Sequence, residues 1–375
     1  MIWFMLIASL MSALMSFYVG WRMHLPTLTT RRLVWGYLFV VWLLSTLAMA
    51  LRLFGIINNT TDMLAWFVYL NMGFFSLLFI VYMLIDIFHA LTQKIKPSPE
   101  RRQFMTSTVS LGVLGGVGIT TGIGFEQAVG GAIVKEVQVP LGNVPEALQK
   151  LKIVQFTDLH IGPMIKQDYV QTLVLQMNAL DADMIVMTGD LVDGSVARLK
   201  DDVAPLGQLK AKHGKFFITG NHEYYSGAEA WITEMKRLGF TVLLNEHEVI
   251  EVEGAKLLMA GVTDYRADRH IASHQTSPKK AIEGAPQVDV KILLAHQPKS
   301  IFEATEVGFD LQISGHTHGG QYYPWNFIAK IANPYIKGLH LHEGKTWIYV
   351  SPGTGYWGPP IRLGNKPEIT LIRLV

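Results

Sequence analysis

The chain has 375 residues, of which 50 % are apolar or aromatic and 17 % are charged, against about 25 % charged in an ordinary soluble domain. Its net charge of +2 combines an excess of +4 over residues 1–130 with −2 over residues 131–375, so neither part has the basic character of a nucleic-acid binder. The sequence contains no cysteine, which excludes disulfides, iron–sulfur clusters and cysteine nucleophiles.

Four uncharged apolar runs occupy the first third of the chain. Three of them, residues 2–20, 33–51 and 63–85, are long enough to span a membrane, since ~20 residues cross a hydrocarbon core of ~30 Å. The fourth, residues 106–125, is richer in glycine and threonine. We therefore predict an all-α transmembrane region of about four helices over residues 1–130.

The loops between these runs predict an orientation, because Lys and Arg concentrate on the cytoplasmic side. The first loop has a charge of +3, the second is neutral and the third is +2. The contributing residues are Arg22, Arg31 and Arg32; Arg52 and Asp62; and Lys94, Lys96, Arg101 and Arg102 against Asp86 and Glu100. The N-terminus is then outside, and everything after the fourth run is also outside if that run spans. If the fourth run were instead a flexible Gly-rich linker, the chain after it would stay in the cytoplasm.

The fourth run has features of its own. It begins at Arg101-Arg102-Gln103-Phe104-Met105, which resembles a twin-arginine export signal except that Glu100 precedes the pair. Ala128-Val129-Gly130 is a weak cleavage site, so we favour an uncleaved span. The GxxxG spacings Gly112/Gly116 and Gly118/Gly122 would permit close helix contact.

Residues 131–375 alternate short apolar runs with helical stretches, which predicts an α/β fold with a mixed sheet or two packed sheets. The expected helices include residues 166–178 and 228–238. The expected strands begin at Leu151, Met184, Lys215, Thr241, Lys256, Lys291, Asp310, Thr346 and Glu368.

Polar clusters follow five of the expected strands. They are Thr157-Asp158-Leu159-His160, Gly189–Gly194, Gly220-Asn221-His222-Glu223, Ala295-His296 and Gly315–Gly320. Ligands of open α/β sheets bind at this carboxyl edge. The clusters therefore predict a functional site built from several loops.

The spacing within the clusters suits metal ligation. Asp158 and His160 are two residues apart, as are His316 and His318, so on extended backbone each pair points to one side. Carboxylate, amide and imidazole donors without sulfur suit Mn, Fe, Zn or Ni. Seven such side chains exceed the needs of one ion, so we predict two divalent ions about 3.5–4 Å apart that share Asp190.

The blocks D-x-H, G-D-x-x-D, G-N-H-[DE], H and G-H-x-H occur in this order, and the pattern resembles the calcineurin-like metallophosphoesterase superfamily over residues 150–325. The membrane segments and the ending Ser351–Pro360 resemble its bacterial membrane-anchored branch. The resemblance implies two packed mixed β-sheets flanked by helices, in a domain spanning residues 131–375.

The resemblance also implies roles for individual residues. Asp158, His160 and His318 would hold the first metal, Asn221, His296 and His316 the second, and Asp190 would bridge them. A bridging hydroxide would attack phosphorus. His222 would protonate the leaving oxygen or stabilise the transition state, and Asp193 would bond to His222 and fix its tautomer. We expect Glu223 to be structural rather than a ligand.

We therefore predict a multi-pass cell-membrane protein with an extracytoplasmic dinuclear-metal phosphoesterase domain, acting on phosphodiesters or lipid-linked phosphates. The alternative is a non-catalytic membrane protein that uses the fold for binding or assembly. The complete ligand set favours the enzyme. Its expected partners are the lipid bilayer and a phosphoester substrate, with no nucleic acid.

Two further predictions concern the surroundings of the site. We expect the remaining histidines of the C-terminal part to be solvated: His213, His247, His270, His274, His340 and His342. The segment 321–337 is rich in aromatic residues, with Lys330 and Lys337 as its only charges. It either packs in the core or lies at a lipid interface, where Trp, Tyr and Lys are favoured.

Overall fold

The computed structural model describes the chain except for residues 1, 24, 26, 55, 57 and 92–98. Lys94 and Lys96 of the third loop lie outside the described residues. The chain divides into two compact units. The helical unit comprises residues 1–126 with 358–361, and the sheet unit comprises residues 127–357 with 362–375.

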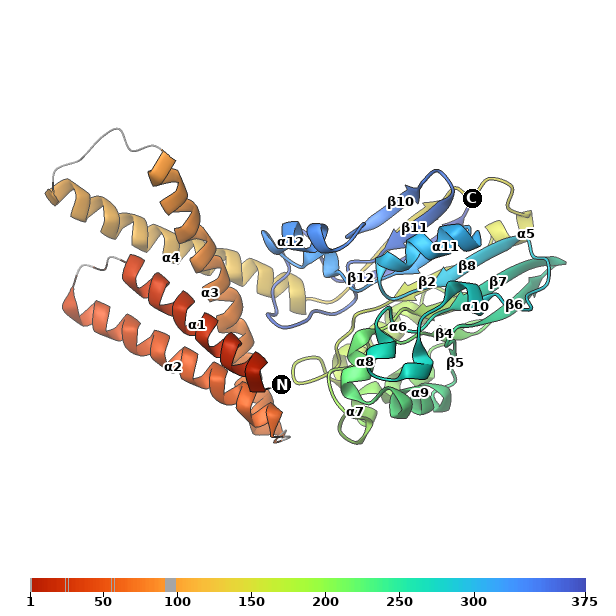
Figure 1. The fold of residues 1–375 in the computed structure, drawn as a ribbon, viewed down its shortest axis with the longest axis horizontal. Helices are drawn as coiled ribbons and strands as arrows, with labels where there is room; N and C mark the ends of the chain where they lie inside the picture. Colours follow the sequence, from red (N-terminus) through yellow and green to blue (C-terminus); the bar gives the residue numbers. More distant parts are fainter. Residues whose placement is uncertain (1, 24, 26, 55, 57, 92–98) are drawn as a thin grey trace. The chain divides into compact units, whose positions relative to one another are not determined.

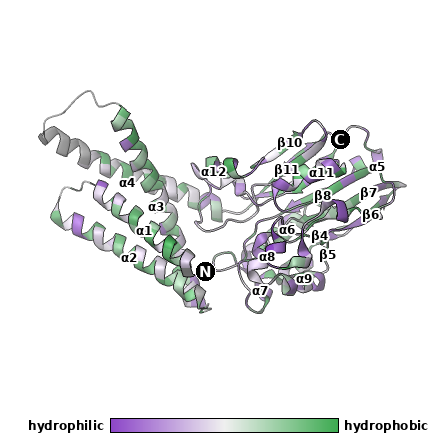
Figure 2. Ribbon diagram, viewed as in Figure 1, coloured by the Kyte–Doolittle hydropathy of each residue, from purple (hydrophilic) through white to green (hydrophobic). Residues whose placement is uncertain are grey.

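The helical unit is built from four long helices: α1 Ile2–Arg22, α2 Leu28–Leu53, α3 Asn59–Leu91 and α4 Pro99–Val129 (Figure 1). All four are long and apolar enough to cross a membrane. Hydrophobic residues recur around the helices rather than on one stripe (Figure 2), as expected of spans surrounded by lipid.

The fourth apolar run forms part of a continuous helix, α4, so the interpretation as a flexible linker is wrong. The described helices make no use of the close contact that its glycines would permit. In the described part of the chain, no atom outside α4's own backbone lies within 4 Å of a Cβ added at Gly112, Gly116, Gly118 or Gly122. Gly116, with Thr120, instead helps to line an apolar cavity of about 230 Å³ against Leu77 and Val81 of α3.

Polar contacts join α1 to α3 near the ends of both helices. The carboxylate of Asp86 forms an ion pair with Arg22 and accepts a 2.7 Å hydrogen bond from the Tyr18 hydroxyl. The C-terminal ends of α1 and α3 therefore lie at the same end of the helical unit.

The sheet unit contains two six-stranded mixed sheets, as predicted. The first has the order β1-β12-β2-β3-β4-β5 and the second β10-β11-β9-β8-β7-β6. The first sheet consists of β1 Ile133–Val139, β12 Glu368–Leu374, β2 Ile153–Phe156, β3 Met184–Met187, β4 Lys215–Phe217 and β5 Thr241–Val242. The second consists of β10 Gly338–His342, β11 Thr346–Val350, β9 Leu311–Ser314, β8 Val290–Leu294, β7 Ala255–Gly261 and β6 Glu246–Val252.

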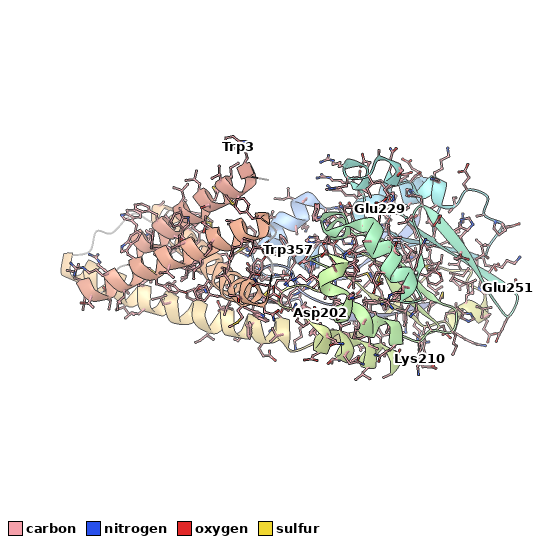
Figure 3. All side chains as sticks on the ribbon, turned by 90° about the horizontal axis from the view of Figure 1, so that it is seen from below. Trp3, Asp202, Lys210, Glu229, Glu251 and Trp357 are labelled. Atoms are coloured by element: carbon pink, nitrogen blue, oxygen red, sulfur yellow. The ribbon has the colours of Figure 1, made fainter. Side chains whose placement is uncertain are left out.

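Helices lie around the two sheets, on their outer faces, at their edges and beside the loops. They are α5 Glu146–Gln149, α6 Gln167–Asn178, α7 Val196–Val203, α8 Asn221–Ser226, α9 Ala228–Arg237, α10 Pro278–Ala281, α11 Ile301–Val307 and α12 Trp325–Ala332. Alternating residues of each strand face opposite layers. Ile153 packs between the sheets, whereas its neighbour Val154 packs with Leu173 of α6 and Trp231 of α9. Charged side chains such as Glu229 and Glu251 lie on the outside (Figure 3).

The sequence analysis missed three strands, and all three are sheet edges. β1, β6 and β10 each pair on one side only. Five of the seven residues of β1 are exposed, and β6 reads Glu-His-Glu-Val-Ile-Glu-Val. Edge strands carry charged residues that discourage further pairing, so they lack the continuous apolar run by which the inner strands were found.

Candidate metal centre

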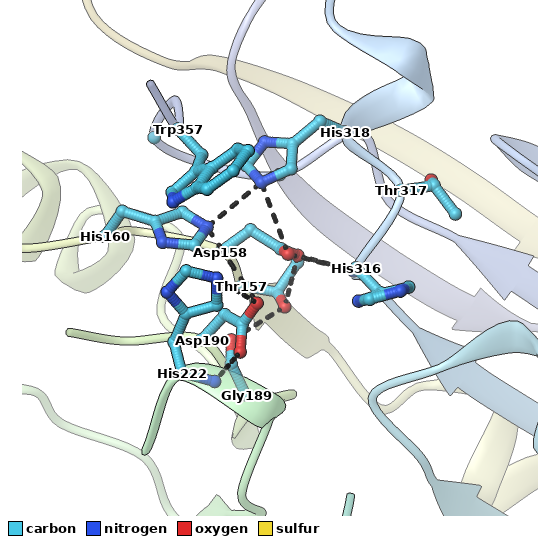
Figure 4. A network of polar contacts seen from close by, with 12 residues as sticks. Thr157, Asp158, His160, Gly189, Asp190, His222, His316, Thr317, His318 and Trp357 are labelled. Atoms are coloured by element: carbon cyan, nitrogen blue, oxygen red, sulfur yellow. Dashed lines mark hydrogen bonds and ion pairs between the residues drawn. The ribbon is translucent and has the colours of Figure 1, made fainter. Parts of the chain in front are cut away.

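Five loops converge at one edge of the sheet unit. They follow β2, β3 and β4 of the first sheet and β8 and β9 of the second. The structure brings all seven predicted metal ligands and both predicted catalytic residues to this edge. Figure 4 shows six of them, Asp158, His160, Asp190, His222, His316 and His318. The edge is therefore the candidate site that the motif order predicts.

The backbone of these loops differs from the prediction. Asp158 and His160 both have φ = 52°, and His316 and His318 have φ = 72° and 52°. These residues are left-handed rather than extended, because each strand has already ended and the chain turns across the sheet edge. Such φ values cost energy in residues with a Cβ and concentrate at functional sites.

Two glycines allow the loops to approach one another. A Cβ added at Gly315 would collide with the carboxylate of Asp158, and one added at Gly220 would collide with the carboxylate of Asp190. Any other residue at these positions would displace a predicted ligand. The glycines of the motifs therefore make room for carboxylates.

The first donor cluster contains Asp158, His160 and His318. The Nε2 atoms of the two histidines are 3.0 Å apart, and His318 Nε2 lies 3.6 Å from Asp158 Oδ1. The Asp158 carboxylate is held in place by the His316 backbone N–H at 2.9 Å and the Thr157 hydroxyl at 2.8 Å. This cluster coincides with the set predicted for the first metal.

The second donor cluster contains Asp190, His296 and His316. His296 Nε2 lies 3.1 Å from Asp190 Oδ2 and 3.2 Å from His316 Nδ1. His296 Nδ1 lies 2.8 Å from the Thr188 carbonyl oxygen and donates to it, which directs Nε2 into the cluster. Asn221 Oδ1 is buried and has no hydrogen-bond partner among the described residues. An unpaired buried oxygen is costly, and a coordinated cation would satisfy it.

The electrostatics differ between the histidines of the two clusters: the pKa of one is raised and the pKa values of two are lowered. Burial is the largest influence on the pKa of His296 and lowers it, but the carboxylates of Asp190, Asp158 and Asp264 together raise the pKa to about 10. Burial and the neighbouring His296 lower the pKa of His316 to about 3. Burial together with Arg362 also holds the pKa of His318 well below its usual range. Neutral imidazoles are the form that binds metal ions.

His222 and Asp193 lie beside the two clusters. His222 Nδ1 is 2.5 Å from Asp193 Oδ1, which also lies 3.3 Å from His160 Nδ1. Asp193 therefore orients two imidazoles, of which the sequence analysis anticipated one. Burial lowers the pKa of His222, but Asp190 and Asp193 raise it more strongly, to about 9. His222 can thus carry a proton at neutral pH.

Glu223 is a structural residue, as expected, and its role is specific. Its buried carboxylate accepts hydrogen bonds from the backbone N–H groups of Asp190, Leu191 and Gly220, at 2.9, 2.7 and 2.6 Å. These bonds hold the left-handed turn at Asp190 against the loop that carries Asn221.

Two residues of the site were missed by sequence reasoning. Arg362 is buried and donates to the carbonyl oxygens of His318 and Pro352, at 3.0 and 2.7 Å. The ring of Trp357 is half exposed and lies 5.7 Å from that of His222. Arg362 lies outside every motif, and Trp357 lies in the ending Ser351–Pro360, whose resemblance to other chains assigns it no role.

One of the histidines expected to be solvated is not. His342 is buried, and its Nδ1 lies 3.0 Å from the Tyr335 hydroxyl. The strand β10 places it against that ring. His270 is exposed, as expected, and lines a cavity described below.

Comparisons with known proteins agree with this geometry. Residues 151–320 match the family model described as calcineurin-like phosphoesterase. A Bacillus subtilis protein, "Uncharacterized metallophosphoesterase YkuE", is 30 % identical over 73 % of this chain and 97 % of its own length. The chain belongs to the calcineurin-like metallophosphoesterase family. Its members are metal-dependent, and the neutral imidazoles and the unpaired Asn221 oxygen of this metallophosphoesterase fit divalent ions.

Other relatives are longer than the matched region. A cattle protein, "Transmembrane protein with metallophosphoesterase domain", is 38 % identical over 67 % of this chain. A Helicobacter pylori "Uncharacterized metallophosphoesterase" is 38 % identical over the same share. The metallophosphoesterase chain spans 59 % of the cattle protein and 66 % of the Helicobacter protein.

Asp190→Asn tests the shared carboxylate. The substitution keeps the shape but removes the charge that attracts cations to the second cluster. We expect loss of bound metal and a fall in turnover of at least ~10²-fold, since even losses around the ligands cost about 10–100-fold. Metal analysis and phosphoester turnover of the purified variant measure both. Full metal with full activity would contradict the assignment.

His222→Ala tests the proton donor separately. His222 lies outside the two donor clusters assigned to metal, so we expect metal content to stay at the wild-type level. Turnover should fall by roughly 10²–10⁴-fold through lost proton transfer. Loss of metal in this variant would instead make His222 part of the metal site.

Proposed function

We propose that this metallophosphoesterase hydrolyses a phosphate ester with two divalent transition metal ions, Mn, Fe, Zn or Ni. Asp158, His160 and His318 would hold one ion, and Asn221, His296 and His316 the other, with Asp190 shared. The observation that carries the proposal is the pair of adjoining donor clusters together with the buried, unpaired oxygen of Asn221.

The chain's own residues supply orientation and a proton. Bound ions of this kind provide an acidified water and a Lewis-acidic charge beside the phosphate. His222 keeps Nδ1 on Asp193 and so has Nε2 free to protonate the leaving oxygen. That Nε2 lies 3.9 Å from Asp190 Oδ2, which places the proton beside the second cluster. Asp193 stabilises the charged imidazole until the proton moves.

The non-catalytic alternative makes a different prediction. A protein that uses the fold only for binding has no need for His222, Asp193 or a complete donor set. This chain retains all of them in contact, which supports hydrolysis.

The first experiment is metal removal and return. We expect protein stripped with a chelator to lose hydrolysis of p-nitrophenyl phosphate and bis(p-nitrophenyl) phosphate. Each of the four metals is then added back in turn, and the recovery of hydrolysis is measured. Asp190→Asn protein, treated in the same way, is the control for contaminating phosphatase. If wild-type and Asp190→Asn protein release nitrophenol at the same rate, the function is not that of an enzyme.

We propose further that the four helices anchor the protein in the cell membrane with the sheet unit outside the cytoplasm. The charges of +3, 0 and +2 in successive loops support this orientation. The contact of Arg22 with Asp86 also supports it, because it joins the helix ends next to the two positive loops. The cattle relative is itself named a transmembrane protein.

Reporter fusions at the C-terminus test the orientation. We expect an alkaline phosphatase fusion to be active, since that enzyme matures outside the cytoplasm. A green fluorescent fusion should be dark if export is unfolded. An inactive phosphatase together with a fluorescent fusion would place the active site in the cytoplasm.

The substrate proposal rests on α12, which follows the His318 loop. No residue of this helix is buried, so the interpretation of α12 as core is wrong. Just before the helix, the described aromatic residue Tyr322 is buried. Ile331 is 87 % exposed and Phe327 is 59 % exposed. An exposed apolar helix beside an active site is a surface suited to lipid.

The segment that follows this helix is hydrogen-bonded to the loops of the metal centre. The Thr317 hydroxyl, between two predicted ligands, donates a 2.5 Å hydrogen bond to the Ile336 carbonyl oxygen. The Lys337 amine donates to Asn365 at 2.6 Å, so Lys330 is the exposed cation on the helix itself. We propose that α12 rests on the bilayer and presents the site to a phospholipid or another lipid-linked phosphate.

The double variant Trp325→Ala with Phe327→Ala tests this role. Because both side chains are exposed, we expect an unchanged melting temperature and unchanged activity on a soluble chromogenic phosphodiester. Activity on lipid substrate in vesicles should fall at least several-fold. Leu175→Ala with Phe302→Ala, at exposed apolar positions on α6 and α11, is the matched control. Equal losses on both substrates, with a lowered melting temperature, would show that the two residues are structural.

A further inference from the structure

A cavity of about 230 Å³ adjoins the second donor cluster. Asn221 and His316 line one side of it, and Arg266, His270 and Lys299 line another. We propose that this cavity binds a second phosphate group of the substrate, so that the preferred substrate carries two phosphates. The inference rests on the proposed phosphoesterase function and extends it to a substrate class.

The lining residues come from the same sheet edge as the metal ligands. Arg266 and His270 flank the 3₁₀ turn Ala267–Arg269 after β7, and Lys299 lies in the 3₁₀ turn after β8. Loops at the carboxyl ends of neighbouring parallel strands meet at one edge. A group bound by these residues is therefore within reach of a phosphate at the metal centre.

The cavity carries two cations whose charge is available to a ligand. Among the described residues, Asp264 alone lines this cavity with a carboxylate, and it is 1 % exposed. It accepts hydrogen bonds from the Gln297 side chain at 2.8 Å and from the backbone N–H of Arg266 at 3.0 Å. Within the described residues, neither the Arg266 guanidinium nor the Lys299 amine has an ion-pair partner. Arg with Lys matches the charge and oxygen geometry of phosphate.

Tyr225 lies between the cavity and His222. Its ring is 64 % exposed and lies 5.3 Å from the ring of His222 and 5.4 Å from that of His270. His222 is the residue proposed to protonate the leaving oxygen. A group in the cavity thus belongs to the leaving alcohol, and the second phosphate is attached to that alcohol.

The size of the cavity limits what it takes. Pockets that hold whole drug-sized ligands measure roughly 300–1,000 Å³. At about 230 Å³, this cavity suits a phosphate on a short linker rather than a whole nucleotide.

A matched substrate series tests the inference. Ethane-, propane- and butanediol bisphosphates are compared with the corresponding hydroxyalkyl monophosphates, by phosphate release from metal-loaded protein. We expect kcat/KM to favour at least one bisphosphate by about 10-fold or more, mainly through KM. Arg266→Gln and Lys299→Gln should each reduce this ratio several-fold. Arg269→Gln, an exposed neighbour that does not line the cavity, should leave the ratio unchanged.

The outcomes separate this inference from the proposed function. Hydrolysis of monophosphates and bisphosphates with equal kcat/KM, or a ratio that Arg266→Gln and Lys299→Gln do not alter, overturns the two-phosphate inference and leaves the phosphoesterase intact. If no ester is hydrolysed, the proposed function fails. Calorimetry then decides the cavity's role, with methylenebisphosphonate against methylphosphonate on wild-type and Arg266→Gln protein. Equal affinity of the wild-type protein for both overturns the inference.

Discussion

Buried hydrogen bonds between the two sheets hold the metal centre together. The Asp158 carboxylate, after a strand of the first sheet, accepts the backbone N–H of His316, after a strand of the second. His296 of the second sheet donates to the Thr188 carbonyl of the first at 2.8 Å. Each donor cluster combines residues from both sheets, so neither sheet alone builds a site. Hydrogen bonds in a dry interior are strong when made and costly when broken. These bonds therefore fix the position of one sheet relative to the other.

The same convergence explains the unusual backbone. Of the ten non-glycine residues with positive φ in the described chain, five are predicted metal ligands: Asp158, His160, Asp190, His316 and His318. Conformations of this kind persist only where surrounding contacts outweigh their cost. Glu223, with its bonds to three backbone N–H groups, supplies such contacts at Asp190, and the Thr157 hydroxyl does so at Asp158. The strained backbone conformations allow the ligand side chains to face one another.

The sequence predicts the inner strands and the donor residues because each leaves a local signal, an apolar run or a short motif. β1, β6 and β10 leave none, since these edge strands mix polar or charged residues with apolar ones. Arg362 and Gln155 leave none either. Gln155 donates to the Ser314 carbonyl across 159 residues, in the middle of an otherwise apolar strand. The left-handed turns also escape sequence reasoning, because tertiary contacts rather than local propensity impose them.

The residues proposed for catalysis and those proposed for substrate recognition differ in how firmly they are held. The donor residues and Glu223 lie on loops clamped by buried bonds, so a change there disturbs several partners at once. The side chains proposed for recognition, those of α12 and the Arg266 and Lys299 side chains, are not buried. Surface side chains of this kind tolerate substitution with little effect on stability. The same hydrolytic centre can therefore be directed to a different ester by changing the surrounding exposed residues, while the bonds between the two sheets stay as they are.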